Sequence, residues 1–266
     1  MLDRDIRTYY DRGGERTRLD GSLELVRTKV LLDRLLPAPP ATVLDVGGAF
    51  GVYASWLAER GYSVKIVDPV PLHVESARAN GFAAEEGDAR TLGEADESWD
   101  VVLLFGPLYH LLDRADRVRA FAEARRVVRP GGLVFGATIS RWASMYELLL
   151  NGLADSPGFA DLVRGDLAAG TRRDTVHLAD GFTTVYFHRP EELPGEVADA
   201  GLRLDGLYAV EGMAQWMPDV TERLADPARR DLVLELAART EREPSTLGST
   251  AHVLVVARRQ SGCGMC

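Results

Sequence analysis

The chain has 266 residues, of which 46% are hydrophobic, and it carries a formal net charge of −9 at pH 7. These apolar residues are sufficient for a folded core, and the acidic balance argues against a broad nucleic-acid surface, which is normally basic. No apolar run approaches the ~18 residues of a membrane-spanning helix, and the charged start is unlike a secretory signal. We therefore expect a cytoplasmic protein with no nucleic-acid partner and no membrane association; composition leaves its oligomeric state unknown.

The first 40 residues precede the first predicted strand. Residues 22–36 carry apolar side chains at helical spacing, and the prolines between residues 37 and 40 end this helix. We expect residues 1–40 to form an N-terminal helical arm that covers part of the fold as a lid.

An apolar run from Thr42 ends in an acidic residue, Asp45, and breaks into a turn of small residues. These small residues are Gly47, Gly48, Ala49 and Gly51, and a helical pattern follows from Val52. A strand, a glycine turn and a helix together hold a nucleotide-like ligand at the top of a parallel sheet. The dinucleotide fingerprint Gly-x-Gly-x-x-Gly does not fit, because its later glycine positions hold Ala49 and Val52.

Further strands alternate with helices. Residues 64–68 predict a second strand that ends in Asp68, and a short third strand precedes Asp88. Residues 99–105 predict a fourth strand, and a fifth strand ends at Ile139. Helical patterns over residues 71–80 and 115–128 lie between them. This order predicts a parallel sheet of βαβ units.

The spacing of apolar residues changes after the fifth strand. Residues 141–182 predict a helical lid insertion without a convincing strand, residues 193–200 a helix, and residues 202–210 and 252–257 the last two strands. We expect one domain overall, with its core in residues 41–140 and 183–260. Residues 261–266, which include Cys263 and Cys266, predict a disordered tail.

The pattern Asp45-x-Gly47-x-Ala49-x-Gly51 resembles the first motif of the class I S-adenosylmethionine-dependent methyltransferases, an acidic residue followed by Gly-x-Gly-x-Gly, with Ala49 in place of the middle glycine. Asp68, Asp88 and the buried fourth strand fall at the family's places, and the resemblance covers most of residues 41–139. It implies a Rossmann-like α/β fold: a seven-stranded, mostly parallel sheet with helices on both faces, an antiparallel last strand and helical lid insertions.

The resemblance also implies a site for S-adenosyl-L-methionine, with S-adenosyl-L-homocysteine as product. It places Asp45, Asp68 and Asp88 at the amine, ribose and adenine, and gives the N-terminal arm a tyrosine and an arginine near the methyl and carboxylate groups. The expected cofactor-binding residues are Tyr10, Arg18, Asp45, Gly47, Gly48, Ala49, Gly51, Asp68, Pro69, Asp88, Ala89 and Phe105. His73 either borders the adenine or faces solvent.

Methyl transfer needs an in-line acceptor and a general base only when the acceptor must lose a proton. His110, just after the fourth strand, is the candidate base, and its alternative role is to order its loop. Tyr109, Tyr186 and His188 are candidate acceptor contacts, with packing as the alternative. We expect no metal, because the histidines lack His-x-x-x-His or His-Glu-x-x-His spacing.

These observations predict a methyltransferase that acts on oxygen, nitrogen or carbon of a small-molecule acceptor, such as a natural product of bacterial secondary metabolism. One alternative is an RNA or protein acceptor, for which the cluster of Arg125, Arg126 and Arg129 would supply a local basic face. Another is a non-catalytic regulatory protein that binds the cofactor, for which Ala49 is the only hint.

Overall fold

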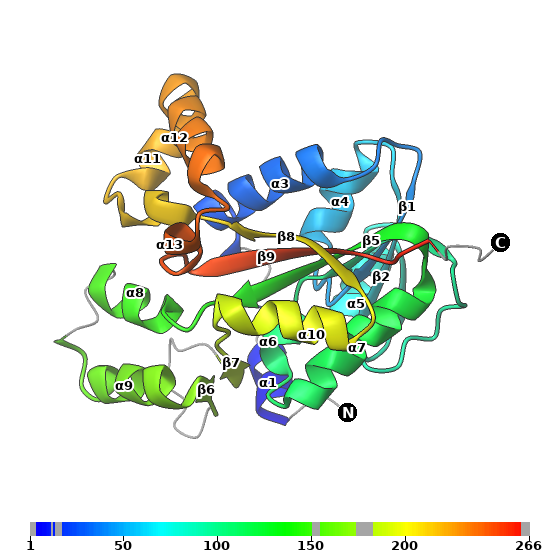
Figure 1. Cartoon of the computed structure of the whole chain (residues 1–266), viewed down its shortest axis with the longest axis horizontal. Helices are drawn as coiled ribbons and strands as arrows, with labels where there is room; N and C mark the ends of the chain where they lie inside the picture. The colour runs from blue at the N-terminus through cyan, green and yellow to red at the C-terminus, as the bar shows by residue number, and fades with distance from the viewer. Residues whose placement is uncertain (1–3, 12, 14–17, 151–154, 174–182, 262–266) are drawn as a thin grey trace.

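The computed structural model describes residues 4–11, 13, 18–150, 155–173 and 183–261 (Figure 1). A seven-stranded sheet with the order β3-β2-β1-β4-β5-β9-β8 forms its centre. The strands are β1 (Thr42–Val46), β2 (Ser63–Asp68), β3 (Ala83–Glu86), β4 (Trp99–Leu104), β5 (Val128–Ile139), β8 (Arg203–Ala209) and β9 (His252–Arg258). The first five run parallel, and β9 lies antiparallel to both β5 and β8. The predicted sheet and its antiparallel last strand are confirmed.

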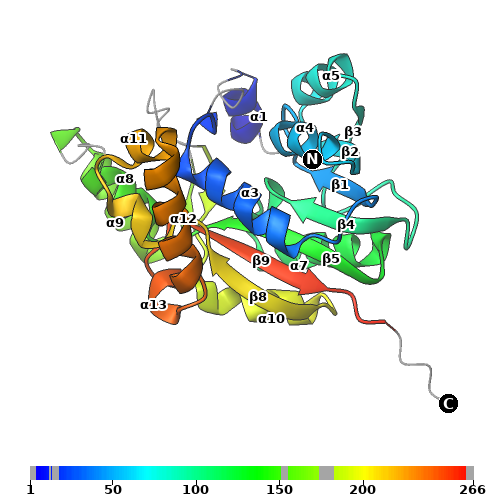
Figure 2. The same ribbon diagram turned by 90° about the horizontal axis from the view of Figure 1, so that it is seen from above.

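Helices cover both faces of this sheet, as Figure 2 shows. One face carries α3 (Leu23–Leu35), α4 (Val52–Ala58) and α5 (Pro71–Ala79), and the other carries α7 (Arg114–Val127) and α10 (Leu193–Asp199). Successive side chains of a strand point to opposite faces, so Val43 packs with the α3 and α4 side while Leu44 packs with the α7 and α10 side. Both are fully buried, which fixes the register of the central strand.

Local chemistry sets the helix boundaries close to their predicted places. The Ser22 hydroxyl caps α3 by accepting a hydrogen bond from the Leu25 amide at 3.1 Å. Pro71 occupies the first turn of α5, where its missing N–H costs nothing. The helix α4 begins directly after Gly51, so its amino end faces the same edge of the sheet as the carboxyl end of β1.

The remaining elements surround the carboxyl edge of the parallel strands (Figure 1). They are α1 (Arg4–Tyr10), α6 (Pro107–His110), α8 (Ala143–Leu150), α9 (Phe159–Ala169), β6 (Thr171–Arg172), β7 (Val185–Tyr186), η2 (Pro190–Glu192), η3 (Gly212–Trp216), α11 (Val220–Ala225), α12 (Pro227–Thr240) and α13 (Pro244–Leu247). The expectation of no strand within residues 141–182 is wrong at β6, which pairs antiparallel with β7. A two-residue strand is too short to leave a periodic signal in the sequence.

The predicted division into arm, core and lid stays a prediction. Cys263 and Cys266 lie outside the described residues, as does most of the predicted tail. Across the described part of the chain, no helix has both the length and the apolar character needed to cross a membrane.

Candidate functional site

A cavity of about 310 Å³ lies at the carboxyl ends of β1, β2, β3 and β4. This first cavity is lined by ten of the twelve predicted cofactor residues: Tyr10, Arg18, Gly47, Gly48, Ala49, Asp68, Pro69, Asp88, Ala89 and Phe105. Its size falls at the lower end of the range of small-molecule sites, and its position is the one at which ligands bind in open α/β sheets. The two remaining residues, Asp45 and Gly51, lie outside its lining.

The glycine turn after β1 brings backbone close to a second loop. Gly47 has a φ of 78°, and a Cβ there would lie 2.8 Å from Cδ of Pro107. Ala49 has a φ of 46°, a left-handed conformation that costs energy for a residue with a side chain. Gly51, with a φ of 80°, turns the chain into α4 rather than facing the ligand space. The turn therefore presents backbone rather than side chains to the cavity.

Asp45 lies outside the lining of the first cavity, and its expected contact with a ligand amine stays a prediction. Its side chain is fully buried beneath Gly48, where an added Cβ would lie 2.6 Å from Oδ2 of Asp45. Neither carboxylate oxygen has a hydrogen-bond partner among the described residues. Burial, together with the neighbouring charge of Asp68, raises the pKa of Asp45 to about 7. The carboxyl group of Asp45 packs directly against the backbone of the glycine turn at Gly48.

Asp68 lies on the cavity wall and organises its surroundings. Its carboxylate accepts hydrogen bonds from the amides of Ala49 at 3.0 Å and Val70 at 2.9 Å, and from Nδ1 of His73 at 2.9 Å. Three of its roughly four acceptor directions are thus used before a ribose could bind. Because Asp68 only accepts, Nδ1 of His73 carries the proton.

His73 does not face solvent; it is 2% exposed and lines the first cavity. Its Nε2 is buried and has no partner within the described part of the chain. With Nδ1 protonated, this nitrogen is a hydrogen-bond acceptor, so a ligand hydroxyl or amine can satisfy it.

Asp88 lines the same cavity but is held by Arg90. The Arg90 guanidinium donates to both oxygens of Asp88, at 2.9 and 2.6 Å, and also to Asp116 at 2.7 Å. These hydrogen bonds lower the pKa of Asp88 to about 2, so it is a carboxylate throughout the physiological range. Its predicted contact with an adenine stays a prediction.

The N-terminal arm reaches the cavity through Tyr10. The Tyr10 hydroxyl lies 2.5 Å from Nε2 of His110, and Nδ1 of His110 lies 2.9 Å from the Thr184 carbonyl. Since that carbonyl only accepts, Nδ1 carries the proton and Nε2 accepts from Tyr10. Burial lowers the pKa of His110 to about 4, which keeps the ring neutral. Both ring nitrogens are therefore engaged in holding the arm and the loop, and the alternative role of His110 fits this geometry better than that of a base.

Arg18 lies on the wall of the first cavity and forms an ion pair with Glu24 at 3.1 Å. A carboxylate of a bound ligand would have to compete with Glu24 for it. Its predicted pairing with a methionine carboxylate stays a prediction.

A second cavity of about 380 Å³ adjoins the first. The two cavities share Arg18, Leu19, Tyr53, Phe105 and Tyr109 as wall residues. The second cavity extends beneath α8 to the amino end of β9 and the carboxyl end of β8, and it is bordered by α3. Tyr109, one predicted acceptor contact, thus lies between the two spaces, with its hydroxyl bonded to the Phe105 carbonyl at 3.2 Å.

Tyr186 and His188 lie outside the linings of both cavities, and their expected role in acceptor binding stays a prediction. The Tyr186 hydroxyl donates to Glu192 at 3.0 Å, and its ring stacks under the Arg117 guanidinium, 3.6 Å from the ring centroid. His188 is 1% exposed, with Nε2 placed 3.4 Å from Glu196. These side chains belong to a buried ionic cluster that joins β7 to α7 and α10.

One polar group in the second cavity was not predicted. Glu24, Glu211 and His252 place their donor atoms within 4.8 Å of one another, the spacing at which a metal ion has to be considered. Nδ1 of His252 instead donates to Glu211 in a short hydrogen bond, so the group is held together by protein contacts. Glu24 and His252 are 228 positions apart, and no spacing rule links them; only the fold brings α3 and β9 together.

The fold and the first cavity define a Rossmann-like nucleotide-binding α/β protein of the type seen in methyltransferases. Residues 44–136 match the family described as "Methyltransferase domain". A ubiquinone biosynthesis O-methyltransferase of Brucella anthropi is 32% identical over 71% of each chain, and one of Methylobacterium nodulans is 34% identical. The latter match covers 64% of this chain and 62% of that protein, so the chain spans about three fifths of its length. The chain belongs to the class I S-adenosylmethionine-dependent methyltransferase family.

Solved structures agree on the fold. An S-adenosylmethionine-dependent methyltransferase from Mesorhizobium loti superposes with a TM-score of 0.60 at 19% identity, covering 90% of this chain and all of that one. At this identity, the likeness concerns the architecture alone.

Proposed function

We propose that the protein transfers a methyl group from S-adenosyl-L-methionine to a small-molecule acceptor. The observation that carries this proposal is the pair of adjoining cavities with five shared wall residues. The first has the fold position and backbone turn of a nucleotide site, and the second offers enclosed space beside it.

The residues of the first cavity fit this cofactor. His73 contributes an unsatisfied acceptor, Asp68 and Asp88 contribute negative charge, and the glycine turn contributes close backbone approach. When bound, the cofactor supplies a methyl group already activated on a sulfonium. The chain's own contribution is to bind, to orient and to exclude water, and the Tyr10–His110 contact holds the arm against this cavity.

The names of the similar proteins support oxygen as the methylated atom, since two of them are O-methyltransferases. For this chain the oxygen acceptor is part of the proposal, as are a role in secondary metabolism and a cytoplasmic location.

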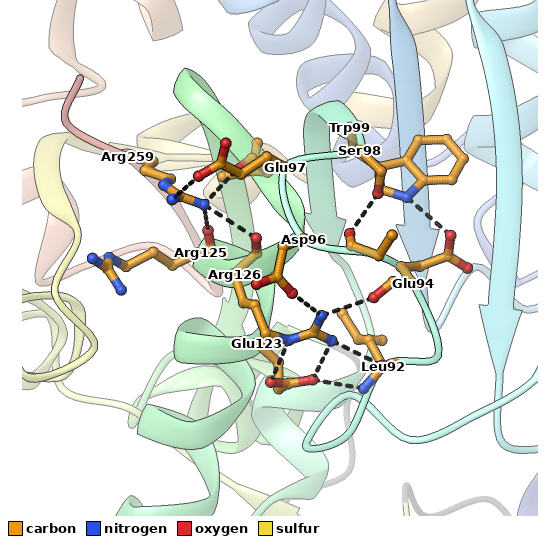
Figure 3. Close-up of polar contacts among 12 residues, drawn as sticks. Leu92, Glu94, Asp96, Glu97, Ser98, Trp99, Glu123, Arg125, Arg126 and Arg259 are labelled. Atoms are coloured by element: carbon orange, nitrogen blue, oxygen red, sulfur yellow. Dashed lines mark hydrogen bonds and ion pairs between the residues drawn. The ribbon is translucent and has the colours of Figure 1, made fainter. Parts of the chain in front are cut away.

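The alternative of an RNA acceptor has little support from the surface. Figure 3 shows the guanidinium groups of Arg126 and Arg259 directed at carboxylates and carbonyls. Arg126 pairs with Glu123 at 2.8 Å and Asp96 at 2.7 Å, and Arg129 pairs with Asp100 at 2.5 Å. Two of the three arginines suggested as a basic face are therefore already neutralised by protein partners.

Methyl transfer from labelled cofactor tests the proposal. Purified protein should label members of a library of hydroxylated and amino small molecules and leave bulk RNA and protein extract unlabelled. Labelling confined to RNA or protein would contradict the small-molecule acceptor. Cofactor binding without transfer to any class would favour the non-catalytic alternative.

A further inference from the structure

The second cavity contains a histidine, His252, whose imidazole is hydrogen-bonded to the carboxylate of Glu211. Nδ1 of His252 donates to Oε1 of Glu211. Oε2 of Glu211 accepts from the His252 amide at 3.0 Å and from the Thr250 hydroxyl at 2.9 Å. Glu211 is thus fixed by backbone and side-chain donors, and it in turn fixes the orientation of the imidazole.

The other ring nitrogen of His252 is left for a ligand. Among the described residues, the hydrogen bonds of His252 involve its amide, its carbonyl and Nδ1, and none of them involves Nε2. The His252 side chain is 22% exposed and forms part of the wall of the second cavity. A base oriented by a carboxylate with its second nitrogen available is the arrangement that general-base catalysis requires.

Resting on the proposed function, we propose that the second cavity binds an acceptor with an apolar body and a weakly acidic hydroxyl, and that the His252–Glu211 pair takes the proton of that hydroxyl. The acceptor oxygen forms a bond to the methyl carbon, the carbon–sulfur bond breaks with its electrons remaining on sulfur, and the proton moves to Nε2 of His252. The proton is then released to solvent, which returns the imidazole to its neutral form.

The wall chemistry matches such an acceptor. Aromatic side chains of Tyr53, Phe105, Tyr109, Tyr146 and Phe187 supply flat apolar surface. The serine hydroxyl of Ser144 is also on this wall. Ser144 is 2% exposed and its Oγ has no partner in the described part of the chain, so it offers a second polar contact to the acceptor.

The charges around His252 suit a hydroxyl of phenol-like acidity. Burial alone would lower the pKa of His252, but the carboxylates of Glu24 and Glu211 outweigh it and raise the pKa to about 9. A phenol has a pKa of about 10, so proton transfer between the two is nearly balanced, whereas an aliphatic alcohol is far less acidic. The other charged or titratable groups facing the cavity are Arg18 from the arm, Tyr53 from α4, Tyr109 from α6, Tyr146 and Glu147 from α8, and Arg172 from β6.

The first measurement separates this inference from the proposed function. Calorimetry with S-adenosylhomocysteine should give equal affinity, within about twofold, for wild type, His252→Asn, His252→Gln and Glu211→Gln. Failure of the wild type to bind would overturn the proposed function and this assignment with it. Glu235→Gln, which removes an exposed carboxylate on α12, is the matched control.

The second measurement titrates His252 directly by NMR of histidine-labelled protein saturated with S-adenosylhomocysteine. Wild type should show one imidazole with a strongly raised pKa, and Glu211→Gln should lower that pKa by at least one unit. The Glu235→Gln control should leave it unchanged. An ordinary pKa for every histidine in both proteins would contradict the proposed action of the His252–Glu211 pair.

The third measurement uses matched probes: 4-ethylphenol, 4-ethylcyclohexanol and 4-ethylaniline. By ligand-observed NMR, the phenol should bind the S-adenosylhomocysteine complex, and with the methyl donor it should be converted. Its kcat/KM should rise about tenfold per pH unit below pH 9, and Glu211→Gln should move this rise to lower pH.

Both His252 variants should lose at least 100-fold in kcat/KM and show no such rise. No binding of the phenol, preference for the alcohol or the aniline, or an unchanged pH profile in His252→Asn would overturn the assignment. So would a stoichiometric metal ion that survives dialysis in wild type and is lost from His252→Asn.

Discussion

The hydroxyl of Tyr10 and Nε2 of His110 lie 2.5 Å apart although the two residues are separated by 100 positions in the sequence. This contact joins α1 to α6 at the wall of the first cavity, and it uses the only lone pair of a neutral imidazole. The arm is thereby held to the wall of the candidate cofactor site.

The Tyr10–His110 contact should be measurable as a coupling energy. Tyr10→Phe removes the donor, and His110→Asn removes Nε2 while an amide N–H can still reach the Thr184 carbonyl. A double-mutant cycle on urea unfolding should give a coupling of about 1 kcal/mol. Additive effects of the two changes would show that the contact contributes nothing to stability.

Gly48 should not tolerate a side chain. An added Cβ would lie 2.6 Å from Oδ2 of buried Asp45, so Gly48→Ala should cost about 1–3 kcal/mol in the free energy of unfolding. Gly165→Ala is the control, because nothing lies within 4 Å of an added Cβ on this helical residue. It should stabilise by about 0.5–1 kcal/mol. Equal effects of the two changes in chemical denaturation would contradict the packing described here.

The raised pKa of Asp45 predicts a pH dependence of stability. Because the folded pKa of about 7 exceeds the ordinary value, the stabilising contribution is complete at about pH 4 and is lost as the pH rises to about 7. Asp45→Asn does not titrate, so its stability relative to wild type should increase over this window, at up to about 1.4 kcal/mol per pH unit, and then level off. A difference that stays constant from pH 4 to 8 would show that Asp45 titrates normally.

Much of the fold was predictable because apolar periodicity and turn residues are local properties of the sequence. The alternation of apolar strands with helices and the turn from Gly47 to Gly51 placed the sheet and the first cavity. That the Asp45 side chain points into the interior beneath Gly48 could not be predicted, because one residue of strand register decides which way a side chain faces. The contacts of Tyr186 and His188 with a buried ionic cluster could not be predicted, because a polar residue near a lid looks the same in sequence whether it binds a ligand or a buried ion pair.

The second cavity could not be predicted from sequence at all. Its polar group combines Glu24 from α3, Glu211 after β8 and His252 at the start of β9, and only the order of strands at the sheet's far edge brings these together. Long-range contacts of this kind leave no periodicity or spacing in a single sequence.

The left-handed Ala49 offers a further test of the glycine turn. With a φ of 46°, alanine carries a conformational cost that glycine avoids. Ala49→Gly should therefore raise the free energy of unfolding by about 1 kcal/mol, as read from denaturant midpoints at an unchanged slope. A destabilised variant would indicate that the Ala49 methyl group makes contacts worth more than the strain.

The central claim, that the first cavity binds the methyl donor, is tested most directly by calorimetric titration with S-adenosylhomocysteine. We predict one site per chain in wild type and at least a tenfold weaker affinity in Asp68→Asn, because the variant loses a charged acceptor that organises Ala49, Val70 and His73. The exposed Asp161→Asn on α9 is the control and should bind as wild type does. No heat of binding in wild type, or equal affinity in Asp68→Asn, would contradict the account.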